Sequence, residues 1–490
     1  MQGVQDHLFI GGSLVTAHGT DRIPVVNPAT EETFAAIPDA DEVDVDRAVR
    51  SAQDAARSSG WGDWPLAERA AALRRLADAL EQRFDELGPL VTSENGTVIA
   101  GSGTANAVAP ARYYRYCAGL ADELATEEGR PTSSGYSLVR KEPVGVCALI
   151  VPWNGPQGSV AWKLGPALAA GCTAVVKPAP ETSLDAYLLA EAITEAGFPD
   201  GVVNILTGGR ETGATLVSHP GVRKVAFTGS TSAGRAVALA CANDFKRVTL
   251  ELGGKSGAIL LEDVDLAKFR PFVASACSPL TGQVCRALTR ILAPRSRYDE
   301  IVDLVAEAMA EIPVGDPMDP AMVFGPLVAE RQRDRVEGYI RVGQEEGAKV
   351  VTGGGRPGGL DVGYYVEPTV FRDVQPGMRI AREEIFGPVI AVIPYEDEAE
   401  ALRLANATEY GLGGAVFTSD PVHGLELARR FESGTVGVNH YALALEVPFG
   451  GTKHSGIGRE LGPDSLLAYQ EIKSIYLAED PREEPATAVH

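Results

Sequence analysis

The sequence lacks paired cysteines and paired histidines. Its six cysteines and seven histidines are scattered along 490 residues, with no Cys-x-x-Cys pair and no two histidines four residues apart. This scatter argues against a disulfide framework and against a protein-bound metal. We therefore expect no metal site, and a reduced, cytoplasmic setting for the chain.

Long hydrophobic runs and clusters of positive charge are also missing. The longest apolar run, 144–152, is far shorter than the roughly 20 residues of a membrane span, and no basic region with an apolar core opens the chain. The net charge is −22, without a run of lysine or arginine. This balance argues against nucleic acid and against an anionic membrane surface as partners. A small molecule is the expected partner.

What is present is an alternation of strands and helices. A chain of 490 residues is too long to fold around a single hydrophobic core, so two or more domains are expected. Short apolar runs alternate with helix-length amphipathic segments at 144–151, 172–176, 202–206, 224–227 and 248–252. Such alternation is typical of βαβ units and predicts a parallel sheet covered on both faces. A second series, at 289–292, 389–393, 412–417 and 435–438, predicts a second α/β domain that begins near residue 253.

The first 120 residues are expected to be mostly helical, and two other segments are expected to be exposed strands. One apolar helix face is formed by Leu66, Ala70, Leu73, Ala77, Leu80, Phe84 and Leu87. Pro65 suits its first turn and Asn95-Gly96 its end. The segments 134–141 and 467–477 are strand-like, and both would be awkward sheet edges in a monomer.

A glycine- and hydroxyl-rich turn follows the fourth predicted strand. No Gly-x-Gly-x-x-Gly follows the first strand, and Gly101-Ser102-Gly103 lies in a helical region. The segment 227–234 instead opens a helix, where backbone donors can meet a pyrophosphate. On spacing alone, a strand–helix turn with a serine cap is the more common explanation.

Two short segments carry a base and a nucleophile. Glu251 lies in Leu250-Glu251-Leu252-Gly253-Gly254-Lys255, and Cys285 ends Gly282-Gln283-Val284-Cys285. The other five cysteines lie in hydrophobic or helical contexts and lack the preceding Gly-Gln. A lone cysteine is more often a packing residue, so the pairing of the two segments makes Cys285 the candidate nucleophile.

Together with Pro152-Trp153-Asn154 and Glu383-Glu384-Ile385-Phe386-Gly387-Pro388, these segments resemble the aldehyde dehydrogenase superfamily, from residue 9 to about 476. The resemblance implies an α/β fold with a parallel-sheet cofactor-binding domain, a second α/β catalytic domain and a small β oligomerisation hairpin. The cofactor-binding domain would span 1–122 and 145–253, and the catalytic domain 254–455. Residues 123–144 and 456–490 would pair subunits into a homodimer or homotetramer.

The resemblance also implies catalytic roles. A non-acylating, NAD(P)-dependent enzyme would oxidise an aldehyde through a thiohemiacetal and a thioester on Cys285. Asn154 and the Cys285 backbone N–H would stabilise the oxyanion, and Glu251 would act as the base of hydrolysis. Lys163 and Glu460 match positions that assist proton movement, although an exposed ion pair is an alternative interpretation.

For the cofactor, the resemblance implies a set of residues around both ends of NAD. Lys177 would contact the adenosine ribose, Glu384 the nicotinamide-side ribose, and Phe386 would support the nicotinamide. NAD-preferring members often carry a glutamate where this chain has Pro180, and Glu181 comes one residue later. NAD is expected, with NADP as a second possibility. The full set is Ile150, Val151, Pro152, Trp153, Lys177, Gly213, Phe227, Thr228, Gly229, Ser230, Leu252, Glu384 and Phe386.

Substrate specificity has a weaker signal. Small residues follow Asn154 and recur in the loop 441–445, where bulk would close a tunnel. A roomy apolar tunnel suits a bulky, long-chain or aromatic aldehyde. Arg286 directly follows the nucleophile and has no assigned role. In one interpretation, its side chain points away from the site. The candidate substrate residues are Gly158, Trp162, Leu443 and Phe449.

Two rival functions stay open. A CoA-acylating dehydrogenase would release the thioester to CoA and would not need a strong hydrolytic base, so Glu251 argues against it. A non-catalytic protein on the same fold would have no need of Cys285 or Glu251, and both are intact.

Overall fold

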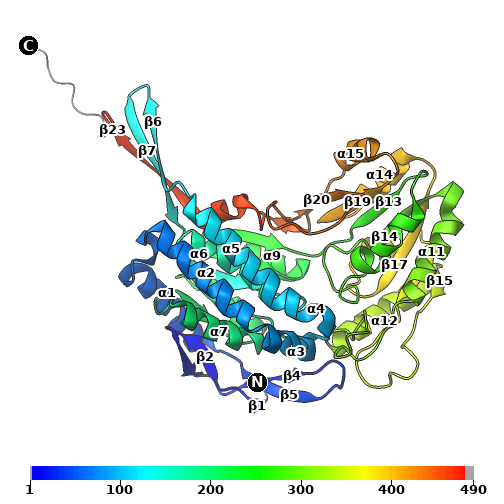
Figure 1. Ribbon diagram of the computed structural model, residues 1–490, viewed down its shortest axis with the longest axis horizontal. Coiled ribbons are helices and arrows are strands. Elements are labelled where there is room, and N and C mark those ends of the chain that lie inside the picture. The colour runs from blue at the N-terminus through cyan, green and yellow to red at the C-terminus, as the bar shows by residue number, and fades with distance from the viewer. Residues whose placement is uncertain (1–2, 481–490) are drawn as a thin grey trace, which may run out of the picture.

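The computed structural model describes residues 3–480, which form two α/β lobes and a projecting three-stranded sheet (Figure 1). Each lobe contains one large sheet with helices on both faces. The fold class expected from the sequence is therefore confirmed.

The first lobe is organised around an eight-stranded sheet in the order β22-β12-β11-β8-β9-β10-β2-β3. Its five central strands are parallel and coincide with the five predicted apolar runs. These strands are β8 (Val146–Ile150), β9 (Thr173–Lys177), β10 (Val203–Ile205), β11 (Lys224–Thr228) and β12 (Arg247–Glu251). The antiparallel edges are β2 (His7–Ile10), β3 (Ser13–Thr16) and β22 (Gly456–Ile457).

The strand order reverses between β8 and β11. From β8 the chain steps outward to β9 and β10, and then returns to place β11 on the other side of β8. The connections after β8 and β11 therefore leave in opposite directions, which opens a crevice at the carboxyl ends of these two strands. The segments Pro152-Trp153-Asn154 and Gly229-Ser230 begin at this point.

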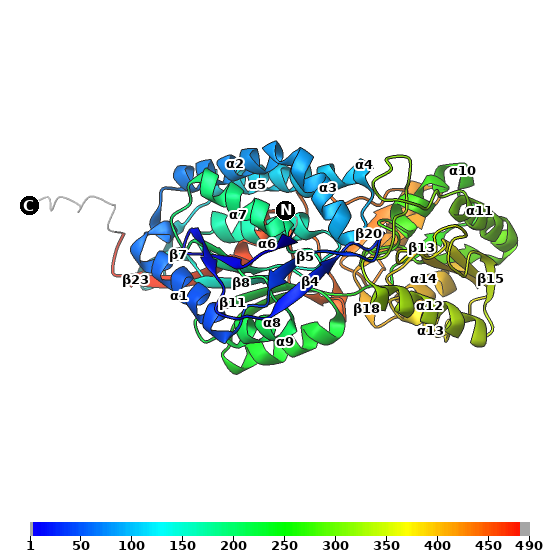
Figure 2. The ribbon, with the colours of Figure 1, turned by 90° about the horizontal axis from the view of Figure 1, so that it is seen from below.

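Helices cover both faces of this sheet (Figure 2). All of β8 is buried; alternate residues belong to different cores, with Ala148 on one face and Cys147 and Leu149 on the other, as strand geometry dictates. One face packs against α1 (Glu42–Ser58), α8 (Arg210–Ser218) and α9 (Thr231–Asn243). The other packs against α2 (Leu66–Gln82), α5 (Ala109–Asp122), α6 (Pro156–Ala169) and α7 (Asp185–Ala196).

The N-terminal region differs from its expected form in two ways. Residues 3–38 are not helical but form strands, among them β1 (Gly3–Val4), β4 (Arg22–Val26) and β5 (Thr33–Pro38). The single helix face expected from 66 to 87 is divided between α2 and α3 (Phe84–Asn95), because Arg83 leaves helical geometry. The predicted stop is confirmed, since Gly96 has a left-handed φ of 76°. A short helix, α4 (Ile99–Gly103), follows.

The second lobe contains a seven-stranded sheet in the order β15-β16-β17-β14-β13-β19-β20. Only β15 is antiparallel to its neighbour. Its strands are β13 (Gly257–Leu260), β14 (Arg290–Pro294), β15 (Lys349–Thr352), β16 (Thr369–Arg372), β17 (Val389–Tyr395), β19 (Gly413–Phe417) and β20 (Thr435–Val438). Its helices are α10 (Leu266–Phe269), α11 (Tyr298–Ala310), α12 (Glu330–Glu345), α13 (Arg379–Arg382), α14 (Glu398–Asn406) and α15 (Pro421–Ala428).

The projecting sheet joins two distant parts of the chain. It contains β6 (Glu127–Thr132), β7 (Gly135–Pro143) and β23 (Gln470–Leu477), all antiparallel (Figure 1). The strands β7 and β23 fall at the two segments expected to be strand-like, whereas β6 precedes the first of them. Residues 456–457 were assigned to the oligomerisation segment 456–490, but they pair with β12 in the first lobe. Residues 481–490 of that segment lie outside the described residues. A small ladder joins β18 (Tyr410–Gly411) and β21 (Thr452–Lys453).

No helix within residues 3–480 is long and apolar enough to cross a membrane.

Candidate active site

The carboxyl ends of the parallel strands bring the predicted site residues together. Ile150, at the end of β8, is in register with Lys177 on one side and Phe227 on the other. Thr228 is in register with Glu251. The candidate base and much of the candidate cofactor set therefore lie along one edge of one sheet.

Two glycines allow the candidate nucleophile to approach this edge. A Cβ on Gly254 would lie 2.3 Å from the carbonyl oxygen of Cys285, so the hinge after β12 and the nucleophile loop touch backbone to backbone. Gly282 has φ 76°, and a Cβ there would lie 2.0 Å from the oxygen of Gly387. Only glycine fits such a position. The motifs that contain Glu251, Cys285 and Glu384 are therefore packed against one another.

Asn154 is tied directly to the nucleophile loop. Its Nδ2 donates to the carbonyl oxygen of Gln283 at 2.7 Å. The preceding carbonyl, that of Trp153, accepts from Nδ2 of Asn95 at 3.0 Å. An amide nitrogen has a second N–H, so Asn154 keeps one donor for an oxyanion formed near Cys285.

Cys285 is half-buried, whereas the other five cysteines are fully buried. Burial, together with the carboxylates Glu384 and Glu251, raises the pKa of its thiol to about 12. The neighbouring Arg286 acts in the opposite direction. Because a thiolate is the reactive form, this thiol requires a base or a bound ligand to ionise at neutral pH.

Glu251 is a buried carboxyl without a hydrogen-bond partner among the described residues. It is 3% exposed, and neither oxygen is hydrogen-bonded. Its Oε1 lies against Gly450, where a Cβ would come within 2.5 Å. Burial, and then the charge of Glu460, raises the pKa of Glu251 well above its usual value. A carboxylate whose pKa is raised is a stronger base than a solvated one, which suits a general base in hydrolysis.

Lys163 and Glu460 form a buried ion pair beside Glu251. Lys163 Nζ lies 2.7 Å from Glu460 Oε1 and also donates to Thr228 Oγ1 at 2.6 Å. Both side chains are almost fully buried. The alternative of an exposed ion pair is therefore wrong.

The nicotinamide-side residues converge from both lobes. Glu384 Oε1 accepts from the backbone N–H of Gly254 at 2.9 Å. The Trp153 and Phe386 rings meet edge to face, with 5.4 Å between centroids. Glu384 and Phe386, from the second lobe, therefore contact the segment after β12 and the loop that follows β8.

The adenosine-side residues lie on the first lobe. Lys177 is buried, donates to the Pro178 carbonyl at 2.8 Å, and has a pKa that burial lowers to about 8. Gly213 in α8 faces its aliphatic stem. Ser230 caps α9 by accepting from Ala233 N, and Leu252 packs under the first turn of the same helix at Gly234. The positive end of α9 thus stands at the crevice.

Sequence reasoning missed several residues of α12 that lie at the same crevice. Gln332 donates to the Phe386 carbonyl at 3.2 Å, and Arg335 donates to the Glu384 and Ile385 carbonyls. Arg331 is ion-paired with Glu181. The sequence offered no signal for these contacts, because α12 lies about fifty residues or more from its partners in the chain.

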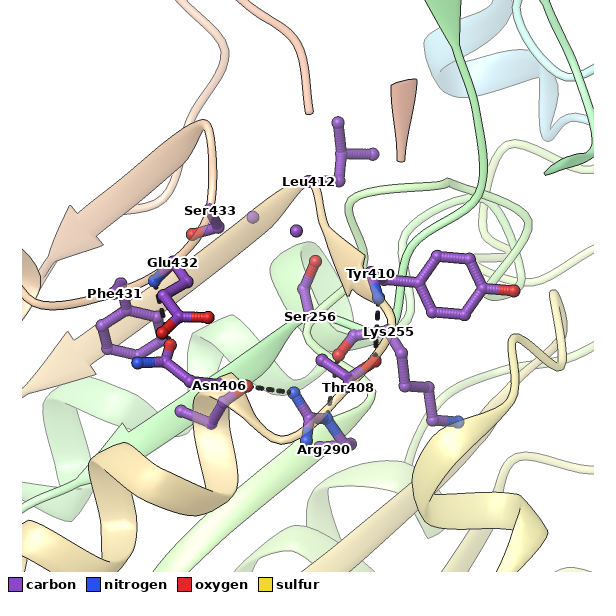
Figure 3. A pocket seen from close by; sticks show the side chains of 13 residues that line it. Lys255, Ser256, Arg290, Asn406, Thr408, Tyr410, Leu412, Phe431, Glu432 and Ser433 are labelled. Atoms are coloured by element: carbon purple, nitrogen blue, oxygen red, sulfur yellow. Dashed lines mark hydrogen bonds between the residues drawn. The ribbon is translucent and has the colours of Figure 1, made fainter. Parts of the chain in front are cut away.

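A buried arginine fixes the hinge between the lobes (Figure 3). Arg290 donates to the carbonyl of Lys255 and to those of Leu404 and Ala405 at the end of α14. The Lys255 ammonium is buried without a partner among the described residues, and burial lowers its pKa to about 7. These contacts hold the segment Gly253-Gly254-Lys255 in place.

The candidate substrate residues divide into two groups. Leu443 and Phe449 line a cavity of about 130 Å³ together with Arg286. Trp162 reaches Phe449, with 6.0 Å between ring centroids. Gly158 lies one turn earlier on α6, and a Cβ there would meet only the carbonyl oxygen of Ala105, at 4.0 Å. Within the described residues, no group of three or more histidine, cysteine or acidic side chains could hold a metal ion.

Comparisons with known proteins agree with this geometry. The model of the Aldehyde dehydrogenase family matches residues 14–475. Geranial dehydrogenase from Castellaniella defragrans is 50% identical, over 96% of this chain and 98% of that protein.

Two solved structures have the same fold. An aldehyde dehydrogenase from Mycobacterium tuberculosis, complexed with NAD+, superposes with a TM-score of 0.95 at 46% identity, over 97% of this chain and 99% of that one. A mutant of aldehyde dehydrogenase C from Pseudomonas syringae, complexed with NAD+ and octanal, gives 0.94 at 39% identity over 98% of both chains. The family and enzyme class expected from the sequence are confirmed: the chain belongs to the aldehyde dehydrogenase family.

Proposed function

We propose that this protein oxidises an aldehyde to the carboxylic acid with NAD, through a covalent intermediate on Cys285. The observation that carries the proposal is the packing of three motifs, containing Glu251, Cys285 and Glu384, through close backbone approaches at Gly254 and Gly282. The nucleophile and the base would then act on one substrate, beside the carboxylate that binds the cofactor.

The residues along the crevice offer groups that suit NAD. The N-terminus of α9 offers a positive end to a pyrophosphate, and the Lys177 ammonium lies at the end of β9. Glu384 offers a carboxylate to a ribose, beside the edge-to-face rings of Trp153 and Phe386. When bound, the nicotinamide supplies a hydride acceptor.

The protein's own groups would carry the remaining steps. The Cys285 thiolate attacks the aldehyde carbonyl, and the amide of Asn154 and the Cys285 N–H stabilise the oxyanion. Loss of hydride leaves a thioester. Glu251 then takes a proton from water, whose oxygen attacks the thioester; the acid leaves and the thiol is restored. Losing one oxyanion donor would raise the barrier by about 3–4 kcal/mol.

Lys163 and Glu460 would carry the proton away from Glu251. Their ion pair connects the surroundings of Glu251 with Thr228, at the start of the cofactor turn. Because the pair is buried, a proton that moves along it would meet little competing water. This role rests on adjacency and charge.

The substrate we propose has a bulky, long-chain or aromatic apolar body. The cavity beside Arg286 contains Ala442, Leu443 and Ala444, so its walls are small or apolar. Geranial, the aldehyde in the name of one relative, has such a body. The octanal bound by another relative is also of this kind.

We further propose that the projecting sheet pairs subunits into a homodimer or homotetramer. On β23, Ile472 is 68% and Tyr476 83% exposed, and apolar groups on a free strand favour association. Sedimentation velocity of the full chain would test this, since a monomer at micromolar concentration would exclude it.

The deciding experiment follows NADH formation at 340 nm with an aldehyde and NAD, with and without CoA. Oxidation without CoA supports the proposal, with the free acid as the product. Turnover only with CoA, yielding an acyl-CoA, would indicate an acylating enzyme. No turnover with any aldehyde would indicate a non-catalytic protein.

A further inference from the structure

Arg286 directly follows the candidate nucleophile and presents a cation to a cavity that contains two of the candidate substrate residues. Its side chain is half-buried and lines the cavity of about 130 Å³ with Leu443 and Phe449. The structure gives it no carboxylate within ion-pair distance among residues 3–480. Arg286 therefore faces the cavity that contains two of the candidate substrate residues.

Tyr441 holds this arginine in place. The guanidinium carbon lies 5.2 Å from the centre of the Tyr441 ring, and the Tyr441 hydroxyl donates to the Arg286 carbonyl at 3.0 Å. One side chain thus stacks on the cation and anchors its backbone. A guanidinium held by an aromatic ring keeps its planar set of donors ready for a planar anion.

The other walls do not satisfy this charge. Most of the lining is apolar, and none of its polar members, Thr435, His440 and Tyr441, is a carboxylate. A partly desolvated cation without an anionic partner is unfavourable. The arrangement is therefore one that a ligand carboxylate would complete.

We propose that Arg286 recognises a carboxylate on the tail of the aldehyde, so that the preferred substrate has an apolar body between an aldehyde and an anionic group. This inference rests on the proposed function, because it assumes that the aldehyde reacts at Cys285. It narrows the substrate class and makes Arg286 a specificity-determining residue.

The size of the effect follows from the kind of contact. A carboxylate can pair with a guanidinium through two parallel N–H bonds, and hydrogen bonds to charged groups contribute enough for about a tenfold to hundredfold preference in kcat/KM. Lysine offers charge without the planar donors, so Arg286→Lys should keep only part of that preference.

The test uses matched aldehydes that differ only in the anionic group. Wild type, Arg286→Gln and Arg286→Lys are assayed with 6-oxohexanoate against hexanal, and with 4-carboxybenzaldehyde against 4-methylbenzaldehyde. Arg429→Gln is the control, because Arg429 is an exposed arginine at the end of α15, outside the lining of the cavity, and the variant removes the same charge from the surface.

The proposal predicts that wild type and Arg429→Gln favour the carboxylated member of each pair about tenfold or more. Arg286→Gln should lose that preference, so that its kcat/KM values for the two members of each pair become nearly equal. Equal preference in wild type and Arg286→Gln, or a wild-type preference for the uncharged aldehydes, would overturn the inference and leave aldehyde oxidation intact. Failure of every aldehyde would instead reject the proposed function.

A binding readout covers the case in which Arg286→Gln is inactive. Benzoate should slow alkylation of Cys285 by iodoacetamide in wild type, and benzamide should not. In Arg286→Gln and Arg286→Lys, the protection by benzoate should fall, whereas Arg429→Gln should match wild type. Protection by benzoate and benzamide alike in wild type would also overturn the inference.

Discussion

Lys163 and Glu460 lie 297 residues apart in the chain and form a buried ion pair with 2.7 Å between Nζ and Oε1. The pair adjoins Glu251 and affects its pKa in two directions. The negative charge of Glu460 raises it, and the positive charge of Lys163 lowers it. The protonation state of the candidate base therefore depends on residues from α6 and from the C-terminal segment.

This relationship predicts opposite pH shifts for two variants. Glu251 must be ionised to take a proton from water, so hydrolytic turnover rises with pH through its raised pKa. Glu460→Gln removes a negative neighbour, which lowers the pKa of Glu251 and moves the rising limb of kcat to lower pH. Lys163→Met removes a positive neighbour and should move the limb to higher pH.

The measurement is kcat against pH for the wild type and both variants, under conditions where hydrolysis limits turnover. NAD binding measured on the same preparations reports whether each variant keeps its fold. Shifts of the same sign in the two variants would contradict the assignment.

The nucleophile can be tested by Cys285→Ala. This variant should retain less than about a hundredth of the dehydrogenase activity, because no other thiol can form the thioester. NAD affinity, measured by quenching of tryptophan fluorescence, should be nearly unchanged. Cys277→Ala is a suitable comparison, since Cys277 is fully buried in the catalytic domain. Activity in Cys285→Ala near that of Cys277→Ala would rule out Cys285.

Cofactor choice should depend on Glu181 and Arg331. Pro180 lacks the carboxylate that would repel a 2′-phosphate, but Glu181 lies beside it and is held by Arg331 from α12. We expect NAD to be preferred, with measurable use of NADP. Glu181→Gln removes a negative charge and frees Arg331, so it should raise kcat/KM for NADP several-fold relative to NAD.

The matched variant combines Glu181→Gln with Arg331→Gln. Without the freed arginine, part of the gain in kcat/KM for NADP should be lost. Dissociation constants for NAD and NADP, measured by calorimetry, give the same comparison without turnover. A wild-type preference for NADP, or no change in the ratio for Glu181→Gln, would refute this account of cofactor choice.

The substrate path can be tested at Gly158. A Cβ there would make only an ordinary contact, 4.0 Å from the Ala105 carbonyl oxygen, so we expect Gly158→Phe to fold and to place its ring near Trp162. Each buried methylene contributes roughly 0.8 kcal/mol, so wild-type kcat/KM should rise from two-carbon to medium-chain aldehydes. Gly158→Phe should reduce activity on octanal more than on acetaldehyde. Gly158→Ala is the control for the effect of replacing a glycine within α6. Equal losses of activity on octanal and acetaldehyde would show that Gly158 does not line the substrate path.

The predictable part of this site lies at strand ends. Buried apolar runs located β8, β9, β11 and β12, and the polar residues directly after them had to share one edge of a parallel sheet. Motifs also located Cys285, Glu251 and Glu384. The close backbone approaches at Gly254 and Gly282 explain why glycine stands at these two positions. The sequence alone did not predict these approaches.

The rest depends on contacts between distant surfaces. Arg331 and Glu181 lie 150 residues apart, and no periodic pattern connects a helix surface in one lobe with a loop in the other. The burial of Lys163 with Glu460 also could not be distinguished from a solvated pair. The break at Arg83 was missed because the apolar repeat continues through it, so periodicity alone did not mark the end of α2.

The most direct test of the central claim is a single-turnover experiment on Glu251→Gln. The claim is that Cys285 carries an acyl group that Glu251 helps water to remove. On mixing with NAD and a medium-chain aldehyde, the variant should give a burst of NADH close to one per active site, followed by a steady rate far below that of wild type. Intact-protein mass spectrometry should then show the acyl adduct, and Cys285→Ala combined with Glu251→Gln should show neither burst nor adduct. Absence of the burst in Glu251→Gln, or a burst without an adduct on Cys285, would contradict the account.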